Sequence, residues 1–331
     1  MSVETEAISL LGRVRRVAES LPFRILVTCG LLGLVAAQID WSRMGSRFSH
    51  GHPLYFLAAV GLVFVALVVG GCRWLLLLRG ADLDVRVGAV ARIYSVATFS
   101  NTFLPTSVGG DVTRTLLVAR RGTLLTRAAV SVVVDRLGGL AGLLGMAWLA
   151  FAFQSATVPD GAQVFLAWVT AAVVVGSALV ATAVFRSPRL ARALVPQRFI
   201  SHAVEIRALL RGYAREPWTM FVVLCASLLY QALISLGLVM LADSIGVHLA
   251  YATAAVVLAL VTVVTLIPIS IGGFGVREGS YVVLLGGASI GATDAALISI
   301  LSVAVLFVVS LPGAVMLARG GIAPALKAAP S

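Results

Sequence analysis

The sequence predicts an all-α polytopic membrane protein built from two inverted-topology repeats, with about six spanning helices and two re-entrant broken hairpins. Three observations support this fold class. Of the 331 residues, 60% are hydrophobic and 12% are charged, whereas soluble domains are roughly 25% charged. Long apolar segments recur along the whole chain, and one glycine-containing motif occurs twice at a constant spacing.

A helix that crosses a bilayer needs about 20 mostly apolar residues. Six apolar segments reach or nearly reach this length, and the first of them is short. Arginines gather in alternate connections, above all in 186–217, while 156–161 and 243–248 hold none. By the positive-inside rule, both termini then lie in the cytoplasm. The six segments are about 24–40, 53–78, 128–155, 162–185, 218–242 and 294–318.

The chain is expected to form one transmembrane domain over residues 22–319. Before it, residues 1–21 place Leu10 and Val17 among apolar residues at helical spacing, with arginines between them. This pattern predicts a cytoplasmic amphipathic helix lying on the membrane surface. After it, residues 320–331 are expected to be a disordered C-terminal tail.

Two further apolar stretches, about 87–104 and 249–267, each run into a proline and a glycine pair instead of a charged loop. The segment after the first, 112–127, carries four arginines and is too polar to span. We therefore interpret the first as part of a re-entrant hairpin that enters from the cytoplasm. The second is interpreted as a hairpin that enters from outside.

An internal repeat relates these two hairpins. Residues 105–114, PTSVGGDVTR, align with 268–277, PISIGGFGVR, at an offset of 163. The same offset carries 53–78 onto 216–241 and 128–155 onto 291–318. The chain therefore divides into repeat one, about 24–155, and repeat two, about 162–318. Repeat one begins inside and repeat two outside, and such inverted repeats with paired Gly/Pro-interrupted segments point to a transporter with a midplane site. The identical pairs are Pro105 with Pro268, Ser107 with Ser270, Gly109 with Gly272, Gly110 with Gly273 and Arg114 with Arg277.

The two motifs predict a cavity for an anion. Broken hairpins inside a membrane must be buried in protein or line a polar cavity. Helices restarting near Asp111 and Phe274 would aim free N–H groups into it, and Arg114 and Arg277 add guanidinium forks suited to phosphate. Arginine inside a membrane costs at least about 2.5 kcal/mol, which makes it a functional candidate. The candidate substrate-binding residues are Asn101, Ser107, Gly109, Gly110, Asp111, Arg114, Ser270, Gly272, Gly273, Arg277 and Glu278.

Two alternatives stay open for these charges. Arg114 could pair with Asp111, and Arg277 with Glu278 or Asp111, as structural locks between the halves. Asp135 and Arg136, inside the third span, form a second candidate set, either for a coupling proton or for an ion pair with another helix. Neighbours on a helix point about 100° apart, so these two are expected to bind different partners.

Composition excludes several other functions. The net charge is +11, but the arginines lie between hydrophobic runs and not on a soluble surface with base-stacking aromatics, so we expect no nucleic-acid partner. Cys29, Cys72 and Cys225 lie in apolar runs without CxxC spacing and are expected to be buried, unpaired hydrophobes. His50 and His52 lack a third ligand. We expect neither a metal site nor a cofactor.

The motifs resemble those of a flippase-like family, the transmembrane region of lysylphosphatidylglycerol synthases and its stand-alone relatives. The first is N-x-x-L-P-x-x-x-G-G-D-x-x-R, from Asn101 to Arg114, and the second is P-x-S-x-G-G-x-G-x-R-E, from Pro268 to Glu278. The resemblance covers roughly 20–320 and implies a bacterial cytoplasmic-membrane protein that translocates a lipid between leaflets. Because we expect no soluble aminoacyltransferase domain after residue 319, the resemblance does not imply lysyl-lipid synthesis.

The leading functional expectation is a secondary flippase and not an enzyme. Its substrate would be an anionic phospholipid or related lipid, of the aminoacyl-phospholipid or polyprenyl-phosphate type. Arg114 and Arg277 would hold the phosphate alternately from the two sides. Lys327 is the only lysine and no P-loop occurs, which excludes an ATP motor within this chain. The alternatives are an accessory or scaffold subunit of a cell-envelope lipid or glycan pathway, and a membrane-embedded lipid-phosphate transferase. A separate synthase or envelope-pathway protein is a potential partner, and an oligomer is compatible with the sequence.

Overall fold

The fold was taken from a computed structural model, which describes residues 21–40, 42, 51–103, 109–119, 123–153, 161–186, 200–266, 270 and 273–319. Within these residues all regular structure is helical, and eleven helices are present. The expected N-terminal amphipathic helix lies outside the described residues up to its last position, Leu21, and the C-terminal tail 320–331 lies wholly outside them.

Five of the six predicted spanning segments are confirmed as helices long and apolar enough to cross a membrane. The sixth is shorter. Helix α2 (Leu21–Ala37) has 17 residues, which at 1.5 Å each cover about 26 Å of a hydrocarbon layer about 30 Å thick. Among the described residues, five helices thus have the length of a span, and α2 is the short one of the six predicted segments. The five are α4 (Pro53–Gly80), α7 (Thr123–Phe153), α8 (Ala162–Arg186), α11 (Pro217–Ser244) and α14 (Ala292–Ala318).

Two pairs of shorter helices occupy the positions of the predicted hairpins. In the first half, α5 (Val87–Phe103) is followed by α6 (Gly109–Val118). In the second half, α12 (Tyr251–Thr265) is followed by α13 (Val276–Gly286). The same order therefore occurs twice: a long helix, a medium helix, a short helix and a second long helix.

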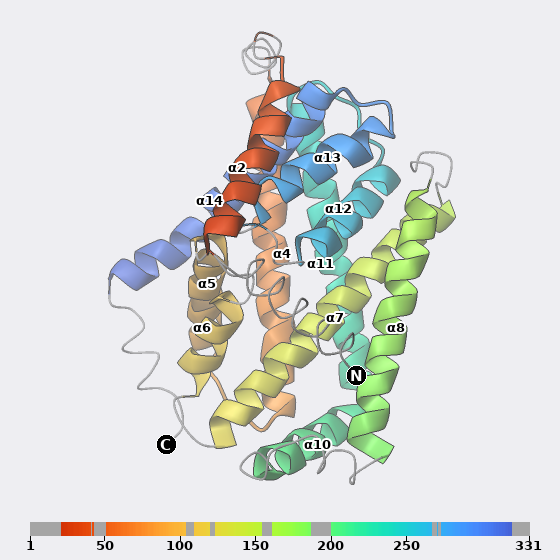
Figure 1. The fold of residues 1–331 in the computed structure, drawn as a ribbon. Helices are drawn as coiled ribbons and strands as arrows, with labels where there is room; N and C mark the ends of the chain where they lie inside the picture. The colour runs from red at the N-terminus through yellow and green to blue at the C-terminus, as the bar shows by residue number, and fades with distance from the viewer. Residues whose placement is uncertain are drawn as a thin grey trace.

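The two halves are interleaved and do not lie side by side. Helix α4 packs along α11 at the centre of the bundle. Helix α5 packs on α14, the last helix of the second half, and α12 packs on α7, the last helix of the first half. Figure 1 shows α5 and α6 on one side of the bundle and α8 on the other. Each short helix pair is thus held against the opposite half.

Glycines permit the closest of these helix contacts. A Cβ atom on Gly142 of α7 would lie 2.7 Å from the backbone carbonyl carbon of Ser227 on α11. A Cβ on Gly313 of α14 would overlap the carbonyl oxygen of Ser95 on α5. The preceding residue, Pro312, lies inside α14 and cannot donate a backbone hydrogen bond there. Small residues at such contacts are typical of membrane helices, whose association depends on close packing.

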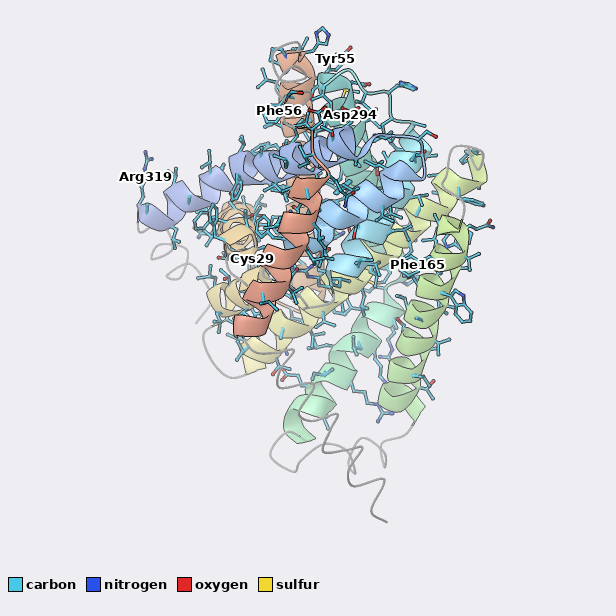
Figure 2. All side chains as sticks on the ribbon, turned by 45° about the horizontal axis from the view of Figure 1, so that its top comes forward. Cys29, Tyr55, Phe56, Phe165, Asp294 and Arg319 are labelled. Atoms are coloured by element: carbon cyan, nitrogen blue, oxygen red, sulfur yellow. The ribbon has the colours of Figure 1, made fainter. Side chains whose placement is uncertain are left out.

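The outer surface of the bundle is apolar. Leu54 is 75% exposed, Trp168 72% and Phe165 44%, and Phe165 belongs to α8, which lies at the edge of the bundle (Figure 2). The expectation that Cys29, Cys72 and Cys225 are buried is wrong, because all three are exposed. An apolar segment predicts burial only where water is the solvent. In a membrane, the lipid-facing side of a helix is as apolar as the side that packs.

Helix α10 (Ile200–Arg215) lies across one end of the bundle (Figure 1). Its Tyr213 is 3% exposed, and the hydroxyl donates a hydrogen bond to the carbonyl oxygen of Leu77 at 2.5 Å. Arg127 of α7 forms an ion pair with Glu205 at 3.5 Å. The arginine-rich linker predicted over 186–217 therefore ends in a helix that forms a hydrogen bond with α4 and an ion pair with α7.

Candidate functional site

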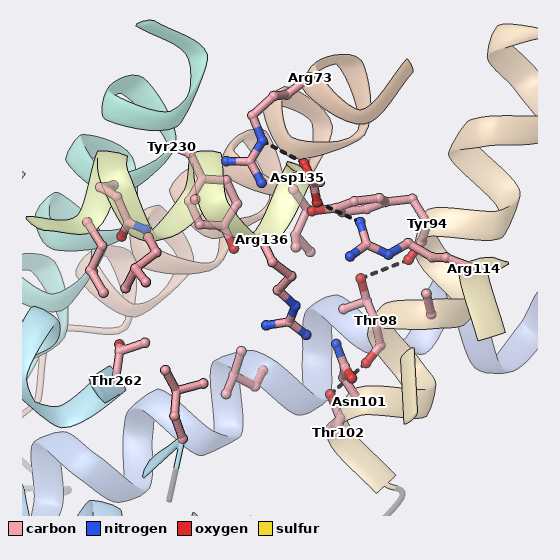
Figure 3. A pocket seen from close by; sticks show the side chains of 18 of the residues that line it. Arg73, Tyr94, Thr98, Asn101, Thr102, Arg114, Asp135, Arg136, Tyr230 and Thr262 are labelled. Atoms are coloured by element: carbon pink, nitrogen blue, oxygen red, sulfur yellow. Dashed lines mark hydrogen bonds and ion pairs between the residues drawn. The ribbon is translucent and has the colours of Figure 1, made fainter. Parts of the chain in front are cut away.

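A cavity of about 550 Å³ lies between the two halves, within the usual range of roughly 300–1,000 Å³ for ligand pockets. Residues of α4, α5, α6, α7, α11, α12, α13 and α14 line it. We call it the arginine cavity, because four arginines line it together with one carboxylate. These residues are Arg73, Arg114, Arg136, Arg277 and Asp135, and Figure 3 labels all of them except Arg277.

Asp135 of α7 joins two of the arginines. One carboxylate oxygen accepts a hydrogen bond from Nε of Arg73 at 2.8 Å, and the other accepts one from Nη1 of Arg114 at 2.8 Å. The side chain of Asp135 is 3% exposed, and those of Arg73 and Arg114 are each 7% exposed. Figure 3 shows the carboxylate between the two guanidinium groups. In so buried a place, each ion is stabilised by the others.

Asp111 of α6 joins a second set. Its two oxygens bind Nη2 of Arg114 and Nε of Arg136, both at 2.6 Å. The Arg136 side chain is 45% exposed, and it reaches into the open centre of the cavity (Figure 3). Asp135 and Arg136, adjacent in sequence, thus bind different partners. Two carboxylates hold three arginines, which leaves an excess of positive charge.

The second half contributes Arg277 to the same cavity. Its Cζ lies 5.7 Å from the ring centre of Phe274, a cation–π distance. The neighbouring Glu278 lies elsewhere: its Oε2 accepts the backbone N–H of Gly275 at 2.6 Å, and Gly275 has φ +81°. Glu278 therefore caps the start of α13 and is not among the residues lining the cavity.

The remaining predicted residues divide between the cavity wall and its support. Asn101 lines the cavity and accepts the N–H of Gly110 at 2.8 Å through Oδ1. Gly109 and Gly110 are buried at the start of α6, Ser270 and Gly273 are buried, and none of the four is a lining residue. Gly273 has φ +79°, a backbone conformation that favours glycine.

Two predicted site residues, Ser107 and Gly272, lie outside the described part of the chain, as do Leu104, Pro105 and Pro268 of the motifs. The structure thus brings Asn101, Arg114, Asp135, Arg136 and Arg277 together around one space. It places the described glycines of the motifs next to that space.

The model of the family described as the lysylphosphatidylglycerol synthase TM region matches residues 23–313. The chain belongs to this family. The match confirms the resemblance inferred from the two motifs and contains every residue that lines the arginine cavity. No curated protein matches the chain. The chain is therefore a multi-pass membrane protein of the lysylphosphatidylglycerol synthase TM family.

In this family member, the cavity residues that the sequence analysis did not single out include Arg73, Tyr94, Tyr230 and Gln231. Nη1 of Arg73 donates a hydrogen bond to Oγ of Ser227 at 3.0 Å, and its Cζ lies 5.9 Å from the ring centre of Tyr230. The signal for Arg73 was present, because it lies inside a 28-residue apolar helix whose other arginine, Arg79, is in the last turn, and an arginine inside a span is itself a functional candidate. The tyrosines gave no comparable signal.

Aromatic rings surround the first-half arginines of this family member. The Cζ atom of Arg114 lies 5.1 Å from the ring centre of Trp74 and 5.4 Å from that of Tyr94. Such rings attract a guanidinium group through their quadrupoles and keep its position fixed. The site is thus a positively charged pocket in which Arg73 and Arg114 are held by both carboxylates and aromatic rings. The side chain of Arg136 is more exposed than those of Arg73 and Arg114.

Proposed function

We propose that this protein is a secondary flippase that moves an anionic phospholipid or related lipid between leaflets, with the phosphate held in the arginine cavity. The observation that carries the proposal is the convergence of four arginines on one cavity among helices long enough to span a membrane. Guanidinium groups bind phosphate oxygens in pairs of hydrogen bonds. An anion in this cavity would also offset the excess positive charge left by the two carboxylates.

The geometry supports a division of labour among the arginines. Arg73 and Arg114 are each bound by buried carboxylate oxygens and shape the wall. Arg136 from the first half and Arg277 from the second would contact the phosphate, because Arg136 reaches into the open space and Arg277 lines it from α13. From the sequence, Arg114 is expected to hold the phosphate. In this proposal Arg114 instead takes the alternative role, a structural ion pair with Asp111.

Transport would use the two halves as inverted repeats, with α5–α6 and α12–α13 as the broken hairpins. The reciprocal packing of α5 on α14 and of α12 on α7 supports this arrangement, because a pseudo-twofold axis exchanges such contacts. Both termini would lie on the cytoplasmic side of a bacterial inner membrane, since the arginine-rich connections favour that orientation. Rocking of one half against the other would then expose the arginine cavity to either leaflet.

A transport assay tests the proposal with the full chain in liposomes that carry tail-labelled phosphatidylglycerol. A membrane-impermeant reductant added outside destroys only the label in the outer leaflet. We expect wild-type protein to make nearly all label accessible, whereas Arg136→Gln/Arg277→Gln leaves the inner half protected, as in protein-free liposomes. Arg92→Gln is the matched control, because Arg92 is an exposed arginine of α5 outside the cavity, and it should transport like wild type.

Two outcomes contradict the proposal. If wild-type protein moves no label at any protein-to-lipid ratio, the chain alone is not a flippase and the accessory-subunit reading takes its place. If the folded double variant transports as fast as wild type, the cavity is not the transport site. Size-exclusion elution and the melting temperature establish that each variant is folded.

A further inference from the structure

A second hollow adjoins the arginine cavity. It is an apolar groove of about 310 Å³ between α4, α5 and α14. Leu67, Tyr94 and Thr98 line both the groove and the arginine cavity. The two spaces therefore share a wall, which is formed by α4 and α5.

The groove offers a hydrocarbon surface open to the membrane. At its edge, Phe64 is 49% exposed, Val68 52% and Val87 59%. The hydroxyls of Ser95 and Thr98 donate to the carbonyl oxygens one turn earlier in α5, each at 2.9 Å. Because these hydroxyls are satisfied by their own helix, they leave the groove suited to an apolar ligand.

Tyr94 separates the two spaces. On the side of the arginine cavity, the guanidinium of Arg114 lies over its ring at 5.4 Å. On the side of the groove, α4 carries Gly71, and a Cβ atom there would lie 3.8 Å from Cγ of Tyr94. Because glycine has no Cβ, this part of the Tyr94 ring stays uncovered. A ring with a cation over one face and a hydrocarbon space beside it marks the boundary between a polar and an apolar compartment.

We propose that this groove binds a hydrocarbon chain of the same lipid whose phosphate occupies the arginine cavity. The inference rests on the proposed function, because it assigns the second part of the same ligand. A lipid with its headgroup between the halves must keep its chains in apolar surroundings. The groove is the apolar space that shares a wall with the cavity and opens to the membrane, so a chain can lie there without leaving hydrocarbon.

Photolabelling of the full chain in liposomes tests the contact directly. The probe is phosphatidylglycerol with a diazirine in one acyl chain, and diacylglycerol with the same chain is the reference that lacks a phosphate. After illumination, peptides are mapped by mass spectrometry. We expect phosphatidylglycerol to label 64–75 and 87–98 more than diacylglycerol does, relative to the exposed face of α8. The excess should disappear in Arg136→Gln/Arg277→Gln, because headgroup and chain are held together.

A substitution in the groove tests its role in transport. Cys72 lies in the groove, whereas Cys225 on α11 lines neither space, and both are exposed. Cys72→Trp fills the groove, and we expect lipid transport to slow about tenfold, the loss for about two chain methylenes displaced from apolar contact. Cys225→Trp is the matched control and should transport at the wild-type rate.

The outcomes separate this inference from the proposed function. If both probes label the groove and the α8 face equally, the groove does not bind a chain of the lipid, even if transport is intact. Transport by Cys72→Trp at the rate of Cys225→Trp also overturns it. If wild-type protein shows the phosphate-dependent labelling but moves no lipid, the groove is supported as a lipid site while the flippase proposal fails.

Discussion

The carboxylate of Asp135 accepts a hydrogen bond from Nε of Arg73 at 2.8 Å, and so joins α7 to α4 inside the bundle. Both side chains are almost fully buried. The same carboxylate also holds an arginine of α6, so a single acidic group fixes the geometry of three helices. Its loss should therefore affect stability before it affects ligand binding.

Asp135→Asn should destabilise the fold strongly. The substitution removes the carboxylate charge that pairs with Arg73, and breaking a buried pair by removing one partner costs about 3 to 5 kcal/mol. Unfolding of the purified protein in detergent, followed by tryptophan fluorescence, measures the change. Asp84→Asn is the control, because Asp84 is exposed. Equal stability of the two variants would show that the Arg73–Asp135 contact does not hold the bundle together.

Arg136→Lys should transport lipid at a rate between wild type and Arg136→Gln. Lysine keeps the positive charge but lacks the fork that binds two phosphate oxygens. Losing one hydrogen bond to a charged group corresponds to about tenfold or more in rate or affinity. Initial rates in the liposome assay rank the three proteins. A lysine variant as slow as the glutamine variant would mean that shape, and not charge, is what the position supplies.

Gly142→Ala should weaken the packing of α7 on α11. The added Cβ would lie 2.7 Å from the backbone carbonyl carbon of Ser227, and backbone cannot move aside without separating the helices. Overpacking of this kind costs about 1 to 3 kcal/mol. Gly61→Ala on α4 is the matched control, since a Cβ at Gly61 meets nothing within 4 Å. The melting temperatures of the two variants should differ, with Gly142→Ala lower, and a reversed order contradicts the packing described.

Tyr213→Phe should lower stability modestly and alter its dependence on pH. The variant loses the hydrogen bond to the carbonyl of Leu77, worth about 1 kcal/mol. Burial, with the nearby charges of Glu216 and Asp82, raises the pKa of Tyr213 above its ordinary value. Its stabilising contribution is therefore complete at neutral pH and is lost as the pH rises above about 10, where the unfolded chain releases the proton.

The measurement is unfolding of wild type and Tyr213→Phe between neutral and alkaline pH. Their stabilities should differ at neutral pH and converge as the pH rises, because only wild type loses the contribution of the buried phenol. A constant difference across the range would mean that Tyr213 titrates as in the unfolded chain. Thr219→Val on α11, which loses an exposed hydroxyl contact with Glu216, serves as a surface control.

The spanning helices could be predicted because membrane length and apolarity leave few alternatives. The five long helices differ from the predicted segments mainly at their ends, where α7 begins at Thr123 and not near 128. Helix α2 was predicted as a short segment over about 24–40 and lies at Leu21–Ala37, since apolar composition alone does not reveal where a helix begins and stops. The exposure of the cysteines could not be predicted, because inward and outward faces of a lipid-solvated helix share one composition.

The candidate site was only partly predictable. Arg114 and Arg277 stood out because a repeated motif marked them, and Asp135 with Arg136 stood out as charges inside a span. The partners of these residues depend on how α4, α6 and α7 meet, which no local pattern encodes. Arg73 was overlooked because it lies in an otherwise apolar segment outside the motif. The apolar groove consists of ordinary membrane-helix residues, so the sequence gives no sign of it.

The reciprocal packing of the halves has a consequence for the order in which the protein matures. Helix α14 is synthesised after the other described helices, yet it covers α5, which leaves the ribosome long before it. Helices of the first half must therefore reside in the membrane for a time with an interface still unfilled. Assembly of the bundle waits until α14 has been synthesised, and a nascent chain stopped ahead of α14 would expose the bare face of α5 to quality control.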